Sequence, residues 1–337
     1  MARKATNKLL QKAKKSKSDE FFTQLCDIKR ELQYYSDCFR DKVIYCNCDD
    51  PEVSNFFRFF KENFQVLGLK KLIASCHKEQ DNNAIALPYR NRACYCEYNG
   101  VDEQIAIIPF DGDGDFRSEE CVNLLRQSDV VVTNPPFSLF REFVSQIVQF
   151  QKQFLIIGNV NAITYKEIFK LIQSDRAWLG VNLGRGISGF IVPDYYQQYG
   201  TEVSINEQGQ TIIATNGCLW LTNLELEQRH EDIKLTKVYL GNEENYPKYD
   251  NCDGINVNRT QDIPMDYDGL MGVPITFLHK YNPDQFEIIR FRKGDDGKDL
   301  RINGKCPYFR ILIKNKKLRS EAKNNHAEVF LHQSSFT

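Results

Sequence analysis

The chain has 337 residues, 42% of them hydrophobic and 26% charged, which is enough for about two globular domains with ordinary cores. Its formal net charge of −1 excludes any argument for a partner from overall charge alone. No apolar run reaches the roughly 18 residues that span a membrane. The basic first 20 residues also lack the apolar segment of a signal peptide. We therefore expect a cytoplasmic protein with reduced cysteines and no membrane partner.

A basic segment opens the chain, with seven Lys and Arg residues before the first acid, Asp19. A second basic run, over residues 310–323, is opposed only by Glu321. Such runs are most often solvated tails, but they also carry the charge that contacts phosphates.

Metal sites are not predicted. The closest pairs among the eleven cysteines are separated by one residue and lack the His partners of a zinc site. The run from Asp111 to Asp115 resembles the start of a calcium loop. Phe116 and Val122, however, occupy the positions where that loop needs Gly and Glu.

Strands and helices alternate along the first half of the chain. β-branched and aromatic runs predict the strands, and apolar residues at helical spacing predict the helices. Residues 78–103 form an insertion or a hairpin. The alternation predicts an α/β fold with a doubly wound, mostly parallel sheet. The predicted strands are 42–48, 70–76, 105–108, 130–132 and 154–157, and the predicted helices are 27–40, 53–64, 119–126, 137–150 and 166–172.

The pattern changes after residue 176. Three strands, 178–181, 189–192 and 218–222, are expected to close the sheet with a partly antiparallel edge. From about residue 225 the periodicity is weak, although six tyrosines argue against simple disorder. We expect a basic arm over 1–18, a domain over 19–225 and a further region over 226–337.

The most informative stretch is Asn134-Pro135-Pro136-Phe137, directly after the predicted strand 130–132. The two prolines end the strand and leave carbonyl oxygens that neither helix nor sheet uses. With the Asn134 amide and the Phe137 ring, these acceptors predict a loop that holds an exocyclic amine of a planar ring for methyl transfer. The alternative is a stiff turn, because Asn and Pro are common turn residues.

Two other loops carry candidate cofactor ligands. Asn47-Cys48-Asp49-Asp50-Pro51 follows the first strand, where α/β folds bind nucleotide-like molecules. Without a Gly-x-Gly-x-x-Gly, this loop suits an ammonium group and ribose hydroxyls, as in S-adenosylmethionine, better than a pyrophosphate. An ordinary acidic turn is the alternative. After strand 105–108, Asp115 can accept from an adenine amino group while Phe116 stacks on the base.

In their order, these motifs resemble those of amino-methylating DNA methyltransferases. Asp19-Glu20-Phe21-Phe22-Thr23 precedes the cofactor loops, the Asn134 motif and a C-terminal recognition region, as in the gamma arrangement of that family. Longer stretches, among them Gly112–Ser118 and Leu219–Leu224, are similar to the EcoRI-type modification methylases over about residues 1–320.

The resemblance implies a bacterial adenine-N6 methyltransferase of a restriction-modification system. It uses S-adenosylmethionine on duplex DNA, on an adenine flipped out of GAATTC. The chain departs from the wider family in lacking Phe-x-Gly-x-Gly and in ending its second strand at Cys76, where many relatives carry an acid for the ribose hydroxyls. Because one adenine is modified per event, a monomer suffices. The implied residues are Asn134, Pro135, Pro136 and Phe137 for catalysis, Phe22, Asn47, Asp49, Asp50, Pro51, Asp115 and Phe116 for the cofactor, and Lys4, Lys12, Lys14, Lys15 and Lys17 for DNA.

Three other functions stay open at this point. An N4-cytosine DNA methyltransferase uses the same kind of loop, although that family more often has Ser at the position of Asn134. A protein glutamine methyltransferase also has an Asn-Pro-Pro-aromatic loop, but needs neither basic termini nor a tyrosine-rich C-terminal third. A catalytically silent DNA-binding module is disfavoured by the intact Asn134 motif.

Overall fold

The computed structural model describes residues 22–77, 93–101, 105–182, 187–192, 203–214, 217–292, 299–306 and 309–318. The arm predicted over residues 1–18, with its five candidate DNA-binding lysines, lies outside these residues. The chain divides into two compact units. The N-terminal unit comprises Met1–Ile172 and Arg176–Leu226, and the C-terminal unit comprises Gln173–Asp175 and Glu227–Thr337.

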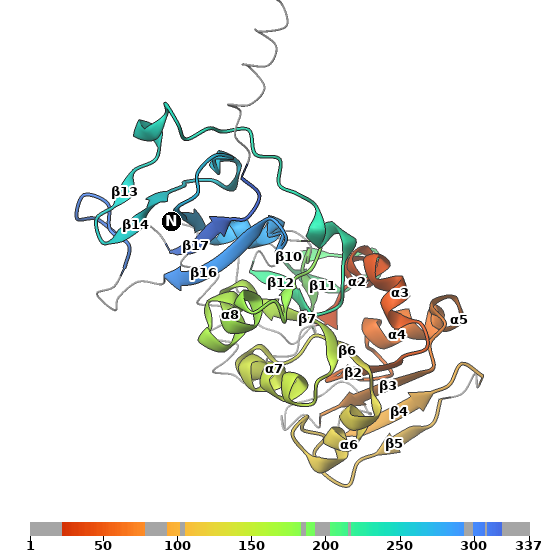
Figure 1. The fold of residues 1–337 in the computed structure, drawn as a ribbon. Helices are drawn as coiled ribbons and strands as arrows, with labels where there is room; N and C mark the ends of the chain where they lie inside the picture. The colour runs from red at the N-terminus through yellow and green to blue at the C-terminus, as the bar shows by residue number, and fades with distance from the viewer. Residues whose placement is uncertain are drawn as a thin grey trace, which may run out of the picture. The chain divides into compact units, whose positions relative to one another are not determined.

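An eight-stranded sheet forms the centre of the N-terminal unit (Figure 1). Its strands are β2 (Val43–Asn47), β3 (Lys71–Cys76), β4 (Cys94–Tyr98), β5 (Ile107–Pro109), β6 (Val130–Thr133), β7 (Gln153–Asn159), β8 (Trp178–Leu179) and β12 (Cys218–Thr222). They lie in the order β5-β4-β3-β2-β6-β7-β12-β8. The middle strands β3, β2, β6 and β7 are parallel, and both edges are antiparallel. Because the chain goes from β2 to β3 on one side and later to β6 on the other, the strand order reverses between β2 and β6.

Apolar sequence explains the middle of this sheet. Every residue of β2 and β6 is buried, as expected for parallel strands that are covered on both faces. The run Val130–Val132 is fully buried, with no exposed surface at any of its three side chains. Strands and helices alternate through this part of the chain, so the expected α/β class is confirmed.

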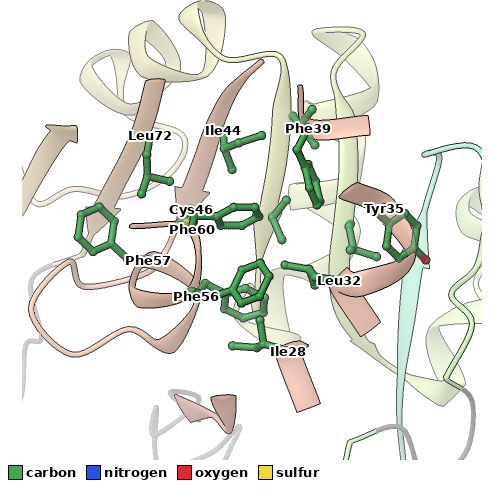
Figure 2. Packing of buried hydrophobic residues seen from close by; sticks show 14 of the residues in the cluster. Ile28, Leu32, Tyr35, Phe39, Ile44, Cys46, Phe56, Phe57, Phe60 and Leu72 are labelled. Atoms are coloured by element: carbon green, nitrogen blue, oxygen red, sulfur yellow. The ribbon is translucent and has the colours of Figure 1, made fainter. Parts of the chain in front are cut away.

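Helices contact both faces of the sheet. On one face, Phe56 and Phe60 pack with Leu32, Ile44 and Leu72 in a single apolar cluster (Figure 2). Tyr45 points to the opposite face, toward Cys121 of α6. The helices of the unit are α2 (Leu25–Leu32), α3 (Ser36–Phe39), α4 (Asn55–Glu62), α5 (Phe64–Leu67), α6 (Glu119–Gln127), α7 (Phe140–Gln149) and α8 (Lys166–Gln173).

Two predicted strands are placed differently from expectation. The strand expected at 105–108 forms as β5, an antiparallel edge strand whose residues are all exposed. The expectation that 189–192 closes the main sheet is wrong, because Phe190–Ile191 (β9) pairs instead with Phe22–Thr23 (β1). A second sheet results, in the order β1-β9-β11-β10, with β10 at Val203–Ile205 and β11 at Thr211–Ile213. Its pairing joins distant segments, which local sequence patterns do not reveal.

Helix boundaries also differ in two places. The helix expected over 27–40 is divided into α2 and α3 by a 3-10 turn at Gln33–Tyr35. Val53, expected inside the next helix, lies in the turn before it, because Ser54 caps α4 by accepting from the N–H groups of Phe56 and Phe57 at 3.1 and 3.3 Å. No helix within the described residues is long and apolar enough to cross a membrane.

The C-terminal unit contains a five-stranded sheet in the order β13-β14-β15-β17-β16. Its strands are β13 (Lys248–Tyr249), β14 (Cys252–Asn256), β15 (Leu270–Pro274), β16 (Phe286–Arg292) and β17 (Arg310–Asn315). Only the pair β14–β15 is parallel among the described pairs of this sheet. The weak periodicity after residue 225 does not reveal this sheet, because polar loops and short 3-10 turns separate its strands.

Candidate active site

Three neighbouring strands of the large sheet end in buried polar residues. Asn47 in β2, Ser75 in β3 and Thr133 in β6 are at most 2% exposed. The hydroxyl of Tyr45 lies 2.7 Å from Ser75 Oγ, which in turn donates to Asn47 Oδ1 at 3.4 Å. Since the strand order reverses between β2 and β6, this polar cluster lies where open α/β sheets bind ligands.

The Asp49 carboxylate connects β2 with β6. Its Oδ1 accepts a hydrogen bond from Ser54 Oγ at 2.7 Å, and its Oδ2 lies 2.5 Å from Thr133 Oγ1. The same Thr133 hydroxyl contacts the main-chain oxygen of Asn47. The last residue before the Asn134 motif is therefore held directly by the predicted cofactor loop.

Asp50 and Pro51 complete this loop. Cys48, with φ at 67°, turns the chain out of β2 through a left-handed conformation. Asp50 is half-buried, and its Oδ1 accepts from the N–H of Glu52 at 2.9 Å, while Pro51 is buried. The two adjacent acids thus have different surroundings, although the sequence pattern predicts the same role for both.

Burial raises the pKa of Asp49 to about 7, and the negative charge of Asp50 adds to that rise. Hydrogen bonds from Thr133 and Ser54 act in the opposite direction, because they stabilise the ionised form. At neutral pH the Asp49 carboxyl is consequently divided between its protonated and ionised forms.

The Asn134 motif leaves the sheet at the end of β6. Asn134 is half-buried and Pro135 is buried, and the N–H of Leu139 donates to the Pro136 carbonyl at 3.0 Å. This turn leads into a 3-10 segment, Phe137–Leu139, so the helix expected from residue 137 begins regular α geometry only at Phe140. The motif is thus a defined loop between a strand and a helix, as predicted.

A second aromatic residue, Phe190, contacts this loop. Its ring lies 6.1 Å from that of Phe137 in an edge-to-face arrangement. Phe190 is in β9, where it pairs with Thr23 of β1. The carbonyl of Thr23 accepts from Asn55 Nδ2 at 2.8 Å, directly after the Asp49 loop. The Phe22–Thr23 strand is thereby linked to both predicted loops.

The Asp115 loop packs against the end of β3. Gly114 has φ at +75°, and a Cβ there would lie 2.5 Å from the Cys76 carbonyl oxygen, so the loop needs glycine at this position. Asp115 accepts from the Arg117 side chain at 2.6 and 2.8 Å, which lowers the pKa of Asp115. Arg117 also binds Glu142 of α7 at 2.9 Å, which ties this loop to the helix after the Asn134 motif.

Phe116 has a packing role in this loop. It is only 3% exposed, and its ring lies 5.1 Å from that of Phe143 in an edge-to-face arrangement. The Arg117 guanidinium lies 5.3 Å from the centre of the same ring. The stacking of Phe116 on a cofactor base stays a prediction, and in this structure the ring supports the loop from within.

The structure links the Asp49 loop to the Asn134 motif through Thr133, the Phe22–Thr23 strand to both through Asn55 and Phe190, and the Asp115 loop to the end of β3 through Gly114. Sequence reasoning missed the side chains that make these links, namely Thr133, Ser54, Asn55 and Phe190. The visible signal was their position beside the motifs, since Thr133 directly precedes Asn134 and Ser54 follows Pro51 by three residues. Among the described residues, no group of three or more His, Cys, Asp or Glu side chains is arranged to hold a metal ion.

Comparison with known proteins decides the family. The family described as "Adenine-specific methyltransferase EcoRI" matches residues 9–316. The chain belongs to this family. It is 63% identical over 325 residues to the Type II methyltransferase M.EcoRI of Escherichia coli, which covers 95% of this chain and 100% of that protein. It is 37% identical over 322 residues to the Type II methyltransferase M.MpnI of Mycoplasma pneumoniae, which covers 90% and 97%. No solved structure matches the chain.

Membership confirms the predicted resemblance and the enzyme class. The chain is an adenine-specific DNA methyltransferase. The individual roles of the site residues stay predictions, which the geometry above makes specific.

Proposed function

We propose that this methyltransferase transfers a methyl group from S-adenosylmethionine to N6 of an adenine that is flipped out of duplex GAATTC. The modification protects that sequence from a cognate endonuclease, as the resemblance to the EcoRI-type methylases implies. One observation carries the proposal: the Asn134 motif leaves β6 next to the Asp49 loop, and Thr133 connects the two. The methylated amine and the methyl donor therefore have adjacent places at the carboxyl ends of β2 and β6.

The residues at this edge fit S-adenosylmethionine. Bound S-adenosylmethionine supplies a methyl group activated by a positively charged sulfur. Its ammonium group and ribose hydroxyls need acceptors, and the loop after β2 offers carboxylate and amide oxygens there. We interpret the sheet as the doubly wound, mostly parallel sheet of S-adenosylmethionine-dependent methyltransferases, with the cofactor at the point where strand order reverses.

The Asn134 motif then acts on the target amine. The Asn134 side-chain oxygen and the Pro135 carbonyl accept hydrogen bonds from the adenine amino group, which directs the nitrogen lone pair toward the methyl group. These acceptors stabilise the positive charge that develops on N6 during attack. Phe137 stacks on the flipped base, and holding both reactants in contact supplies much of the rate. The new N–C bond forms as the S–C bond breaks, so S-adenosylhomocysteine leaves as a neutral thioether, and the N6 proton leaves to water after transfer.

Recognition of DNA falls to other parts of the chain. The C-terminal unit carries loops rich in Asn, Lys and Tyr, whose side chains suit base and phosphate contacts. Lys4, Lys12, Lys14, Lys15 and Lys17 supply phosphate contacts from the N-terminal arm. A monomer suffices because each event modifies one adenine.

Methyl transfer to defined plasmids tests this proposal. Tritiated S-adenosylmethionine is incubated with the full chain and plasmids with or without GAATTC, and the labelled nucleoside is identified. We expect N6-methyladenine only on the site-bearing plasmid. Label on both plasmids overturns the proposed site, label in N4-methylcytosine overturns the proposed base, and label in neither overturns the function.

A further inference from the structure

The two adjacent acids of the cofactor loop differ in how many hydrogen bonds the protein makes to their carboxylates. Both Asp49 carboxylate oxygens have side-chain partners, Ser54 on one side and Thr133 on the other. Among the described residues, the Asp50 carboxylate has one hydrogen bond, from the main-chain N–H of Glu52 at 2.9 Å. Both carboxylate oxygens of Asp49 thus have partners within the protein, whereas the Asp50 carboxylate can accept further hydrogen bonds.

The contacts of Thr133 imply where the proton of this cluster lies. A hydroxyl has one hydrogen, yet Thr133 Oγ1 contacts two oxygens, the Asn47 carbonyl and Asp49 Oδ2. Because a carbonyl only accepts, both contacts become hydrogen bonds when Asp49 is protonated and donates to Thr133, which then donates to Asn47.

The surroundings of Asp49 favour that protonated form. Asp50 on the same loop is the charged group that acts on Asp49, and it opposes ionisation. Burial is the larger cause that opposes ionisation, and it outweighs the hydrogen bonds from Thr133 and Ser54, which stabilise the ionised form. On β2, the Cys46 thiol is fully buried, and Asp49 raises its pKa further.

The charge of Asp50 acts on cysteines at the end of β3 and on β4. Its charge contributes to the raised pKa of Cys76 and also acts on Cys94, which pairs with Cys76 across β3 and β4. A carboxylate supplied from the neighbouring β2 loop occupies the same end of the sheet.

We propose that Asp49 is a positioning residue that locks the Asn134 motif to β2 through Thr133, and that Asp50 alone is the carboxylate that receives the ammonium or hydroxyl groups of the methyl donor. This division rests on the proposed function. It predicts that disturbing Thr133 shifts Asn134, which slows methyl transfer, whereas disturbing Asp50 weakens donor binding.

Four variants of the full chain test the division. S-adenosylmethionine binding is measured by calorimetry without DNA, and methyl transfer is measured in single turnover at saturating donor. Asp50→Asn should weaken donor binding about tenfold or more, and the donor concentration needed for half-maximal single-turnover transfer should rise by the same factor. Asp49→Asn should leave donor binding within about twofold, because its amide donates to Thr133 as the protonated acid does.

Thr133→Val and Thr133→Ser separate positioning from folding. Thr133→Val keeps the shape of the side chain and should slow single-turnover transfer about tenfold to a hundredfold with donor binding unchanged. Thr133→Ser restores the hydroxyl and should restore the rate. Between pH 6 and 8, the wild-type rate should show an inflection near 7 that Asp49→Asn lacks.

The outcomes distinguish this inference from the proposed function. Weaker donor binding in Asp49→Asn with normal binding in Asp50→Asn overturns the division while leaving the proposed function intact. A slow Thr133→Ser variant, or an inflection that persists in Asp49→Asn, overturns the role of the hydroxyl link. A wild-type chain that binds no S-adenosylmethionine overturns both the inference and the proposed function.

Discussion

The two units of the chain place their buried polar residues differently. In the N-terminal unit, Asn47, Ser75 and Thr133 are collected at one end of neighbouring strands. In the C-terminal unit, Asn282 and Gln285 instead hold a loop, by hydrogen bonds to the main chain of His230 and Ile233 at 2.9 Å each. Buried polar side chains therefore gather at the ends of neighbouring strands in one unit and fix irregular connections in the other.

This difference follows from how each sheet is made. Parallel strands bring their carboxyl ends to one edge, so polar residues at those ends meet without long loops. The C-terminal sheet is mostly antiparallel, so the carboxyl ends of its neighbouring strands mostly lie at opposite sides of the sheet. We infer that chemistry belongs to the first unit and that the second unit displays a surface for DNA.

Removal of Asn134 gives the largest expected effect. Asn134→Ala should lower single-turnover methyl transfer about a thousandfold, because it deletes an acceptor that acts on the developing charge. DNA and S-adenosylmethionine binding should each change by less than about threefold. Asn123→Ala, on the exposed side of α6, is the matched control and should keep full activity. Near-normal transfer by Asn134→Ala would contradict the assignment of chemistry to this edge.

The next largest expected effect is on how the stability of the N-terminal unit depends on pH. The pKa of Asp49 in the folded chain, about 7, is above the ordinary value of 3.8 for an aspartate, so the folded state binds a proton that the unfolded state has lost. Stability from this group is complete below about pH 4 and is lost as pH rises through about 7. Asp49→Asn should therefore gain stability relative to the wild type over that window, by roughly 4 kcal/mol at most.

Denaturant unfolding at pH 5 and pH 8 measures this effect. The exposed acid Asp37 offers a control, since Asp37→Asn removes one carboxylate outside the buried cluster. A constant difference between Asp49→Asn and the wild type across this range would mean that Asp49 has an ordinary pKa.

The basic arm should have a smaller effect, restricted to DNA. Deleting residues 2–17 removes seven positive charges, so it should weaken DNA binding about tenfold to a hundredfold and reduce its dependence on salt. Replacement of the five candidate lysines by Gln should reproduce most of the loss. Binding isotherms at salt concentrations of about 50 to 200 mM measure how steeply DNA affinity falls with salt. An unchanged slope would make the arm a solvated tail.

In the N-terminal unit, sequence patterns predict those elements that depend only on neighbouring residues. The buried run Val130–Val132 and the two prolines after Asn134 predicted a strand that ends in a loop, and both are present. The link from Thr133 to Asp49 was not predicted, because it depends on the register between β2 and β6. The pairing of Phe22 with Ile191 likewise joins segments that no periodicity connects.

The C-terminal unit was less predictable for a different physical reason. Its strands begin or end in polar residues such as Asn256 and Arg310, which sequence patterns assign to loops. In the structure these two side chains satisfy each other, since Arg310 Nε donates to Asn256 Oδ1 at 2.9 Å. Burial of a guanidinium is tolerable only with such partners, and the partners are far apart in the sequence.

Tyr249→Phe tests that network with the smallest change. The Tyr249 hydroxyl also donates to Asn256 Oδ1 at 2.9 Å, and the residue is 6% exposed. Losing this bond should lower the free energy of unfolding of the C-terminal unit by about 1–2 kcal/mol. S-adenosylmethionine binding should be unchanged, because the proposed donor site belongs to the N-terminal unit. Tyr34→Phe, at an exposed position of that unit, is the control and should be neutral. Weaker donor binding in Tyr249→Phe would show that the two units do not divide recognition and chemistry as inferred.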